Sequence, residues 1–169
     1  AELMEVKNHL YGRVSDYAQR VKANFQPGAT PWHVPVDVAL PCATQNELDG
    51  KDAELLVKNG VKCVAEGANM PSTLDAVKVF EGRGVLYAPG KASNAGGVAT
   101  SGLEMSQNSM RISWSHEEVD ARLHGIMCSI HEACLKHGRR ADGSVSYVNG
   151  ANVAGFVKVA EAMLAQGVI

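Results

Sequence analysis

The stretch VKCVAEGANMPSTLDAVKVFEGRGVLYAPG, residues 61–90, decides the fold. It begins with a short apolar run, VKCVAEG (61–67), and ends with a second one, GVLYAPG (84–90). Between them, TLDAVKVFEGRG (73–84) has a helical pattern, which Ser72 or Thr73 can cap and which places Asp75 near the positive helix end. A strand, a helix and a strand at this spacing predict a right-handed crossover between parallel neighbours.

The same alternation extends toward the N-terminus. A further apolar run, VPVDVALP (34–41), precedes QNELDGKDAELLVKNG (45–60), whose end at Asn59-Gly60 is typical of a helix C-cap. Residues 1–21 have the pattern of one or two amphipathic helices, and Pro27, Gly28 and Pro31 predict a loop after them. The sequence therefore predicts an α/β fold with three parallel strands.

After residue 94 the pattern changes from alternating strands to helices alone. We predict three helices, over about 96–112, 116–137 and 150–166. Ser115 and Glu118 fit a capping box at the start of the second helix. The segment RRADGSVSYVNGAN (139–152) has the composition of an exposed connection.

Composition limits the classes of function. The 169 residues are 46% hydrophobic and 20% charged, which is typical of a globular domain, and the net charge of −2 gives no electrostatic footprint for nucleic acid. No apolar run approaches the roughly 18 residues needed to cross a bilayer. We therefore expect neither a nucleic-acid nor a membrane partner.

The cysteines predict a reducing compartment. Cys42, Cys63, Cys128 and Cys134 show no paired close spacing, so we expect free thiols and a cytoplasmic protein. Cys128, His131 and Cys134 fall on one predicted helix, but positions six apart diverge by about a third of a turn. Since zinc needs convergent ligands, we expect no metal site there.

Polar side chains follow all three predicted strands. Thr44, Gln45 and Asn46 follow the first, Glu66, Gly67 and Asn69 the second, and Lys91, Ser93 and Asn94 the third. Because ligands of parallel sheets bind at the carboxyl ends of the strands, we expect these loops to form a cleft for a polar ligand. The alternative is that asparagine and glycine are here simply loop residues.

The segment NAGGVATSGLE (94–104) places two glycines where a helix begins, with Thr100 and Ser101 one turn in. Free N–H groups and the helix dipole at this position favour an anion, whereas the alternative is close helix packing at Gly96 and Gly97.

Known nucleotide-binding motifs are absent from the sequence. Gly84 precedes Gly90-Lys91 by one residue too many for a phosphate-binding P-loop, and no G-x-G-x-x-G links a strand to a helix.

Four motifs together resemble the C-terminal part of the hexameric glutamate dehydrogenases, in particular the NADP-dependent type. They are PVDVALPCATQNEL (35–48), VAEGANMPST (64–73), APGKASNAGGVATSGLEMSQN (88–108) and VNGANVAGFVKVAEAMLAQGVI (148–169). The resemblance implies reversible reductive amination of 2-oxoglutarate with ammonium to L-glutamate, with NADP as the cofactor and NAD not excluded. It also implies a homohexameric parent enzyme.

The resemblance assigns roles to individual residues. It implies that Ser101 binds the distal carboxylate of the substrate, with Gly97 and Val98 lining that pocket. It places Asn69 and Asn94 near the nicotinamide and its ribose, and we assign Gly67 and Gln45 of the same strand ends to the cofactor as well. No residue of this chain resembles a catalytic acid or base of the family.

The resemblance also implies a domain organisation. Residues 1–95 correspond to the second half of a dinucleotide-binding domain, with the C-terminal half of a Rossmann-like sheet. Residues 96–169 correspond to a helical tail that returns toward a substrate domain, which this sequence lacks together with the glycine-rich fingerprint. We therefore expect a fragment that is inactive by itself.

Three other interpretations stay open at this point. A dehydrogenase of leucine, valine or phenylalanine would need an apolar pocket where Ser101 stands. A stand-alone nucleotide-binding module without catalysis would explain the short chain, although a half sheet leaves one edge unpaired. A purely structural helical partner would leave the three polar strand ends unexplained.

Overall fold

The computed structural model describes residues 2–167 and divides the chain into two compact units, one ending at Pro31 and one beginning at Trp32. The first unit holds two helices, α1 (Glu2–Asn8) and α2 (Val14–Val21), as the amphipathic pattern predicted. Val6 and Ala18 are its buried side chains, and Arg20 pairs with Glu5 at 3.4 Å.

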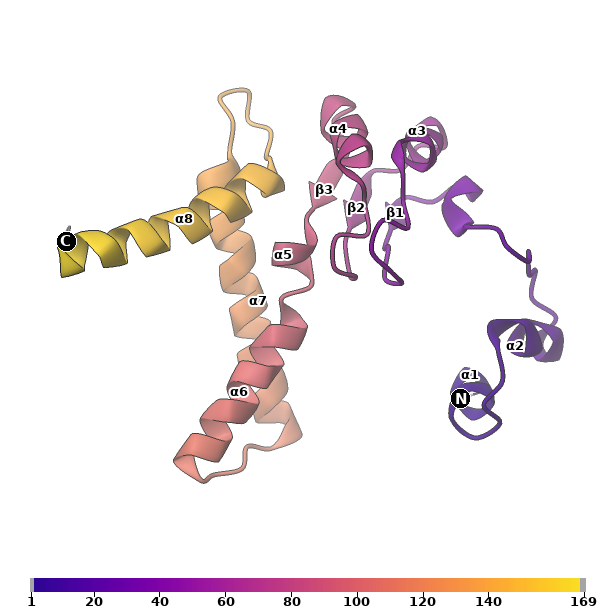
Figure 1. The fold of residues 1–169 in the computed structure, drawn as a ribbon, viewed down its shortest axis with the longest axis horizontal. Helices are drawn as coiled ribbons and strands as arrows, with labels where there is room; N and C mark the ends of the chain where they lie inside the picture. Colours follow the sequence, from indigo (N-terminus) through magenta and orange to yellow (C-terminus); the bar gives the residue numbers. More distant parts are fainter. Residues whose placement is uncertain (1, 168–169) are drawn as a thin grey trace. The chain divides into compact units, whose positions relative to one another are not determined.

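The second unit contains the predicted parallel sheet (Figure 1). Its strands are β1 (Val38–Ala39), β2 (Cys63–Ala65) and β3 (Leu86–Ala88), in the spatial order β1-β2-β3. Val64 of the central strand is in register with Ala39 on one side and Tyr87 on the other. β1 is shorter than the predicted run 34–41, because Pro35 and Pro41 cannot donate ladder hydrogen bonds.

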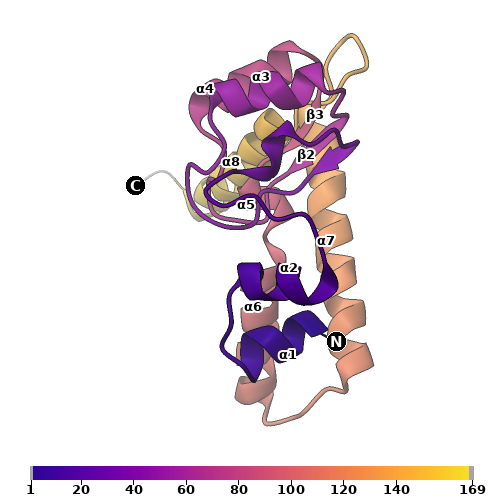
Figure 2. The ribbon, with the colours of Figure 1, turned by 90° about the vertical axis from the view of Figure 1, so that its right-hand side faces the viewer.

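Two helices, α3 (Gly50–Lys58) and α4 (Leu74–Gly82), connect the strands and lie side by side (Figures 1 and 2). Asp49 caps α3 by accepting from the N–H groups of Lys51 and Asp52. Thr73, and not Ser72, caps α4 by accepting from Ala76 N at 3.4 Å.

The predicted C-cap at Asn59-Gly60 is confirmed. Asn59 is the C-cap, and Gly60 has a φ of +88°, which favours glycine. Gly60 N donates to Val57 O at 3.0 Å, and Val61 N donates to Leu56 O at 3.1 Å. This is the Schellman arrangement, and it turns the chain from α3 directly into the segment that leads to β2.

The core of this unit lies between the sheet and these helices. Leu48, Leu56, Val64 and Phe80 are fully buried, and the Phe80 ring stacks on Tyr87 with 5.8 Å between ring centroids. Trp32, in the 3₁₀ turn Pro31–His33, joins this cluster and donates from Nε1 to Glu47 O at 3.2 Å. The core therefore combines residues of the strands and of the helices between them with Trp32 and Leu48 from the connecting segments.

Helices alone follow β3, as predicted. They are α5 (Gly90–Ser93), α6 (Gly96–Met110), α7 (His116–Gly138) and α8 (Tyr147–Gln166). The capping box of Ser115 and Glu118 is confirmed at the start of α7. The one-turn helix α5 was not predicted from the sequence.

The prediction of an exposed connection over 139–152 was wrong for its last part. Helix α8 begins at Tyr147 because Ser146 caps it, accepting from Asn149 N at 3.3 Å. Helices α7 and α8 contact each other closely, since a side chain at Gly150 would collide with the backbone of Cys134. None of the helices within residues 2–167 is long and apolar enough to cross a membrane.

Candidate functional site

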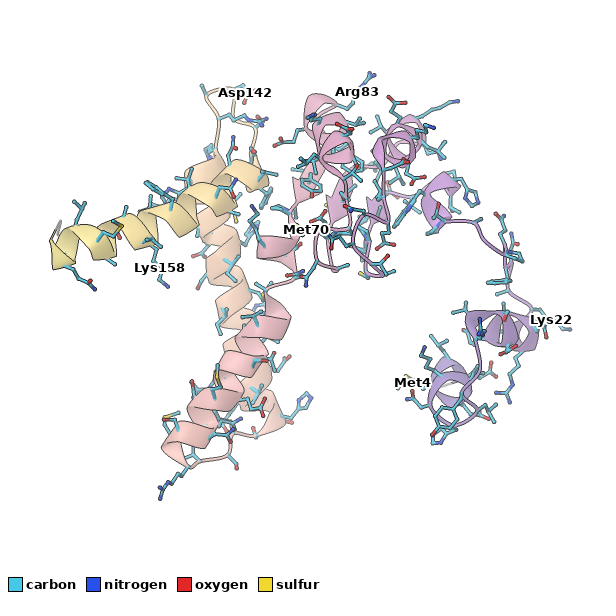
Figure 3. All side chains as sticks on the ribbon, viewed as in Figure 1. Met4, Lys22, Met70, Arg83, Asp142 and Lys158 are labelled. Atoms are coloured by element: carbon cyan, nitrogen blue, oxygen red, sulfur yellow. The ribbon has the colours of Figure 1, made fainter. Side chains whose placement is uncertain are left out.

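The loops after the three strands meet around a hollow of about 600 Å³. Each loop contributes an asparagine to it: Asn46 after β1, Asn69 after β2 and Asn94 after β3. Met70, labelled in Figure 3, belongs to the same lining and is 62% exposed. The structure thus brings the predicted polar strand ends together at one edge of the sheet.

Asn69 and Asn94 contact each other directly. Asn94 Nδ2 donates to Asn69 Oδ1 at 2.9 Å and to Ala68 O at 3.0 Å. Within residues 2–167, Asn94 Oδ1 and Asn69 Nδ2 then have no hydrogen-bond partner. The pair therefore offers one acceptor and one donor to a ligand.

Beneath this pair lies a buried carboxylate that sequence reasoning treated only as a polar strand end. Glu66 follows β2 and is 4% exposed. Its Oε1 accepts from Tyr87 OH at 2.6 Å and Ser72 N at 3.2 Å, and its Oε2 accepts from Gly90 N at 2.7 Å. These three donors come from three separate segments of the chain.

The Glu66 carboxylate also changes the titration of its neighbour. Burial first, and then the hydrogen bond and charge of Glu66, raise the pKa of Tyr87 above its ordinary value of 10.0. Tyr87 thus stays a hydrogen-bond donor throughout the physiological range. An acidic residue at the end of an apolar strand was the one sequence signal for this arrangement, and its partners lie 6 to 24 positions away.

Two side chains of α5 fix the loop after β3. Ser93 Oγ donates to Glu66 O at 2.6 Å, and Lys91 Nζ donates to Asn152 Oδ1 of α8 at 2.6 Å. Lys91, the lysine of the predicted cleft, is thus held by α8.

The start of α6 follows two residues after Asn94. The first backbone hydrogen bond of this helix runs from Ala99 N to Ala95 O at 2.9 Å, so the N–H groups of residues 96–98 have no acceptor within the helix. Thr100 Oγ1 donates back to Gly96 O at 2.9 Å, whereas Ser101 is exposed. Gly97 is exposed and Val98 is 79% exposed.

Not all the predicted residues line the hollow. Gln45 is exposed in the loop after β1, and it is its neighbour Asn46 that lines the hollow. Gly67 packs against Cys42, whose Sγ would collide with any Cβ at this position, and Gly67 N donates to Pro41 O at 2.9 Å. Gly97, Val98 and Ser101 lie outside its lining, on the first turns of α6.

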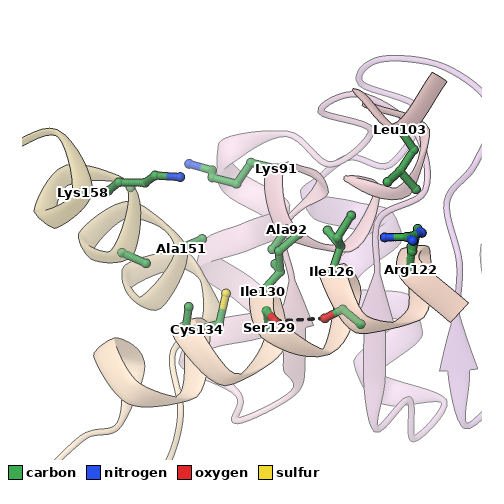
Figure 4. Close-up of a pocket in the computed structure, with 14 residues that line it drawn as sticks. Lys91, Ala92, Leu103, Arg122, Ile126, Ser129, Ile130, Cys134, Ala151 and Lys158 are labelled. Carbon is green, nitrogen blue, oxygen red and sulfur yellow. Dashed lines mark hydrogen bonds between the residues drawn. The ribbon is translucent and has the colours of Figure 1, made fainter. Parts of the chain in front are cut away.

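A larger hollow of about 920 Å³ lies among α6, α7 and α8 (Figure 4). Small and apolar side chains form most of its lining, and the Lys91 and Lys158 side chains point toward one another above it. Of the polar strand-end residues predicted from the sequence, Lys91 lines this hollow as well as the smaller one, and none of the residues assigned to the substrate or the cofactor lines it. Cys134 is buried in its wall, whereas Cys128 is exposed with its Sγ 3.5 Å from His124 Nε2. Residues 2–167 bring together no group of three metal-ligating side chains.

The candidate site thus combines a parallel sheet with polar strand ends and a helix whose first N–H groups have no acceptor within the helix. Residues 1–167 match the family model Glutamate/Leucine/Phenylalanine/Valine dehydrogenase, and the chain belongs to this family.

Within this family, the chain is similar to several glutamate dehydrogenases. The chain is 61% identical to the NADP-specific glutamate dehydrogenase of Escherichia coli K12 over all its 169 residues, which are 38% of that relative. It is 56% identical to the NAD(P)-specific glutamate dehydrogenase of Xylanibacter ruminicola over 168 residues, again 38% of that protein. The chain thus spans well under half the length of the relatives it matches.

Solved structures agree with the observed fold. The glutamate dehydrogenase of Plasmodium falciparum superposes with a TM-score of 0.92 at 45% identity, over 99% of this chain and 36% of that one. The predicted α/β class, with a three-stranded parallel sheet and a C-terminal helical segment, is confirmed.

Proposed function

We propose that the enzyme carrying this chain interconverts 2-oxoglutarate and ammonium with L-glutamate, using a nicotinamide cofactor. The observation that carries the proposal is the 61% identity, over the whole chain, to an NADP-specific glutamate dehydrogenase. The Asn69–Asn94 pair and the open start of α6 support the proposal, because Asn94 lies two residues before Gly96, the first residue of that helix, and the two features suit two different ligands.

The asparagine pair fits a carboxamide. Asn94 Oδ1 can accept from the NH₂ group of a nicotinamide, and Asn69 Nδ2 can donate to its carbonyl oxygen. Gly67 and Gln45 would flank the cofactor from the neighbouring loops. NADP(H) supplies the hydride chemistry when bound, and these residues hold and orient the ring. The curated relatives support NADP, with NAD as an additional cofactor in some of them.

The start of α6 fits the distal carboxylate of glutamate. The N–H groups of residues 96–98 have no acceptor in the helix, and the helix dipole adds a partial positive charge. Ser101 can donate one more hydrogen bond, while Gly97 leaves the backbone accessible and Val98 lines the side of the pocket. Charge-assisted bonds of this kind contribute about 1.5–3 kcal/mol each, and an apolar 2-oxo acid would forfeit them.

Proton transfer is assigned to the rest of the enzyme. Lys91 is bonded to Asn152, and Glu66 accepts three hydrogen bonds away from solvent, so neither is poised to exchange a proton with a substrate. The residues of this chain therefore bind and orient both ligands.

We further propose that the enzyme is a hexamer, which the family resemblance supports. We also propose that it is cytoplasmic, which the four free cysteines support.

Steady-state kinetics test the proposal on the polypeptide as the cell makes it. NADPH oxidation, followed at 340 nm, should require both ammonium and a 2-oxo acid. We expect 2-oxoglutarate to be preferred over 4-methyl-2-oxopentanoate and phenylpyruvate by at least about a hundredfold in kcat/KM, because the apolar acids leave the carboxylate site unpaired. Preference for an apolar acid would reject glutamate as the substrate, and no oxidation with any acid would reject the reaction.

A further inference from the structure

The Glu66 carboxylate joins the three segments that make the predicted cofactor edge. Its donors are the backbone of Ser72 before α4, the side chain of Tyr87 in β3 and the backbone of Gly90 at the start of α5. Glu66 belongs to the lining of the hollow, but it is only 4% exposed, and both of its carboxylate oxygens already accept hydrogen bonds from these three donors. We therefore expect it to act through the loops it holds.

The held segments end at the asparagine pair. Asn69 lies three residues after Glu66, and Asn94 is the C-cap of the helix that begins at Gly90. A Cβ at Gly90 would lie 2.9 Å from Ala68 O and 3.2 Å from Asn94 Nδ2, so α5 sits directly on the loop after β2. Ser93 ties the same helix to Glu66 O at 2.6 Å. A shift of Gly90 would therefore separate Asn94 from Asn69.

We infer that Glu66 is a positioning residue for the nicotinamide, which acts by fixing the Asn69–Asn94 pair in its ligand-ready geometry. This inference rests on the proposed function. It adds to the proposed function a buried carboxylate whose oxygens are already bonded to the protein, and on whose hydrogen bonds the affinity for the nicotinamide end of the cofactor depends.

The variant Glu66→Gln isolates the role of the carboxylate. A glutamine side chain has one acceptor oxygen and one NH₂ group, but Ser72 N–H and Gly90 N–H approach opposite oxygens of Glu66. Whichever way the amide turns, its nitrogen faces a main-chain donor, and one of the two loops has to move. The overall size of the side chain is unchanged.

Two binding measurements separate an effect on the nicotinamide end of the cofactor from an effect on the whole cofactor site. Fluorescence titration gives the Kd for NADPH, and competition gives the Kd for adenosine 2′,5′-bisphosphate, which lacks the nicotinamide. In the polypeptide as the cell makes it, Glu66→Gln should raise the Kd for NADPH about tenfold or more and that for the bisphosphate less than about twofold. Glu81→Gln is the matched control. The Glu81 carboxylate, like that of Glu66, accepts from a side-chain hydroxyl, in this case that of Ser146 at 2.8 Å, but it lines a different hollow. We expect both constants to stay within about twofold.

A double-mutant cycle tests the route through the pair. If Glu66 acts through Asn94, then Glu66→Gln should change the NADPH affinity by less than about twofold in an Asn94→Ala background. If the two substitutions instead raise the Kd for NADPH independently, so that their fold-changes multiply in the double variant, the inference is overturned. It is also overturned if Glu66→Gln weakens the binding of NADPH and of the bisphosphate equally, or leaves the NADPH affinity unchanged. A wild-type enzyme that binds no NADPH would reject the proposed function instead.

Tyr87→Phe decides the question if Glu66→Gln does not fold. It removes one donor from Glu66 Oε1, the oxygen that also accepts from Ser72 N, so the carboxylate is held less firmly between the two loops. We expect the Kd for NADPH to rise about two- to fivefold with the bisphosphate unchanged. Unaltered NADPH binding in a folded Tyr87→Phe enzyme would then contradict the inference.

Discussion

Two neighbouring hydroxyl groups near the start of α6 are used differently. Thr100 Oγ1 donates to Gly96 O within the helix, whereas the Ser101 hydroxyl makes no hydrogen bond within residues 2–167 and Ser101 is exposed. The sequence predicts both residues one turn into the helix. It does not show which hydroxyl stays free for a ligand, because this depends on the side-chain rotamers. The family resemblance selected Ser101, and the geometry leaves it available for a carboxylate.

Ser101→Ala should therefore impair substrate binding selectively. Loss of one charge-assisted hydrogen bond should raise the KM for 2-oxoglutarate about tenfold or more, and that for NADPH by less than about twofold. Initial-rate kinetics with each substrate varied in turn provide the measurement. Ser109→Ala, an exposed serine further along the same helix, is the control. An unchanged 2-oxoglutarate constant would remove Ser101 from the site.

The Tyr87–Glu66 hydrogen bond predicts a pH dependence. Because the folded protein raises the pKa of Tyr87 above 10.0, the protonated phenol stabilises the fold below pH 10, and this contribution is lost as the pH rises above it. Tyr87→Phe should lower the melting temperature near pH 8 and lower it less above pH 10. Thermal unfolding across this range measures the difference, with exposed Tyr11→Phe as control. A difference that does not change with pH would mean that Tyr87 ionises normally.

At the scale of elements, side-chain caps mark the starts of α3, α4, α7 and α8. Asp49 accepts from two backbone N–H groups of α3, and Asp52 reciprocates by accepting from Asp49 N at 3.4 Å. Asp49→Ala should therefore cost about 1 kcal/mol in the free energy of unfolding. Glu54→Ala, an exposed change within the same helix, should stay within about 0.5 kcal/mol in a denaturant titration. Equal effects of the two changes would show that the cap contributes nothing.

Elements governed by local chemistry could be predicted from the sequence. The three strands, the helices between them and the capping box at Ser115 all follow from patterns within a few residues, and the structure confirms them. The early start of α8 was missed, because Ser146 lies in a segment rich in loop residues and also donates to distant Glu81. The Glu66 contacts were missed for the same reason: tertiary packing, not spacing, brings the donors together.

At the scale of the whole molecule, large apolar side chains stay exposed on the helices that follow the sheet. Phe156, Val159 and Met163 on α8 and Val98 and Met105 on α6 are each at least 60% exposed. Large exposed apolar side chains that gather on one surface are typical of contact surfaces. They fit an enzyme in which these helices contact further protein, in keeping with relatives of which this chain covers 38%.

A polypeptide of these 169 residues alone should not oxidise NADPH. Its amides and hydroxyls can orient ligands, but Lys91 and Glu66 are engaged in internal contacts, and positioning with proton transfer supplies many kcal/mol of barrier lowering. The assay compares it with the polypeptide made from the complete reading frame at equal molar concentration. Steady, ammonium-dependent oxidation by the 169-residue polypeptide would contradict this expectation.

In the proposed function, the asparagine pair and the start of α6 hold the cofactor and the substrate side by side. A crystal structure of the enzyme with NADP and L-glutamate would show this arrangement. We predict hydrogen bonds from the nicotinamide carboxamide to Asn94 Oδ1 and Asn69 Nδ2, and from Ser101 Oγ to the distal carboxylate of glutamate. A carboxamide held by other residues, or a glutamate whose distal carboxylate lies away from α6, would contradict the account.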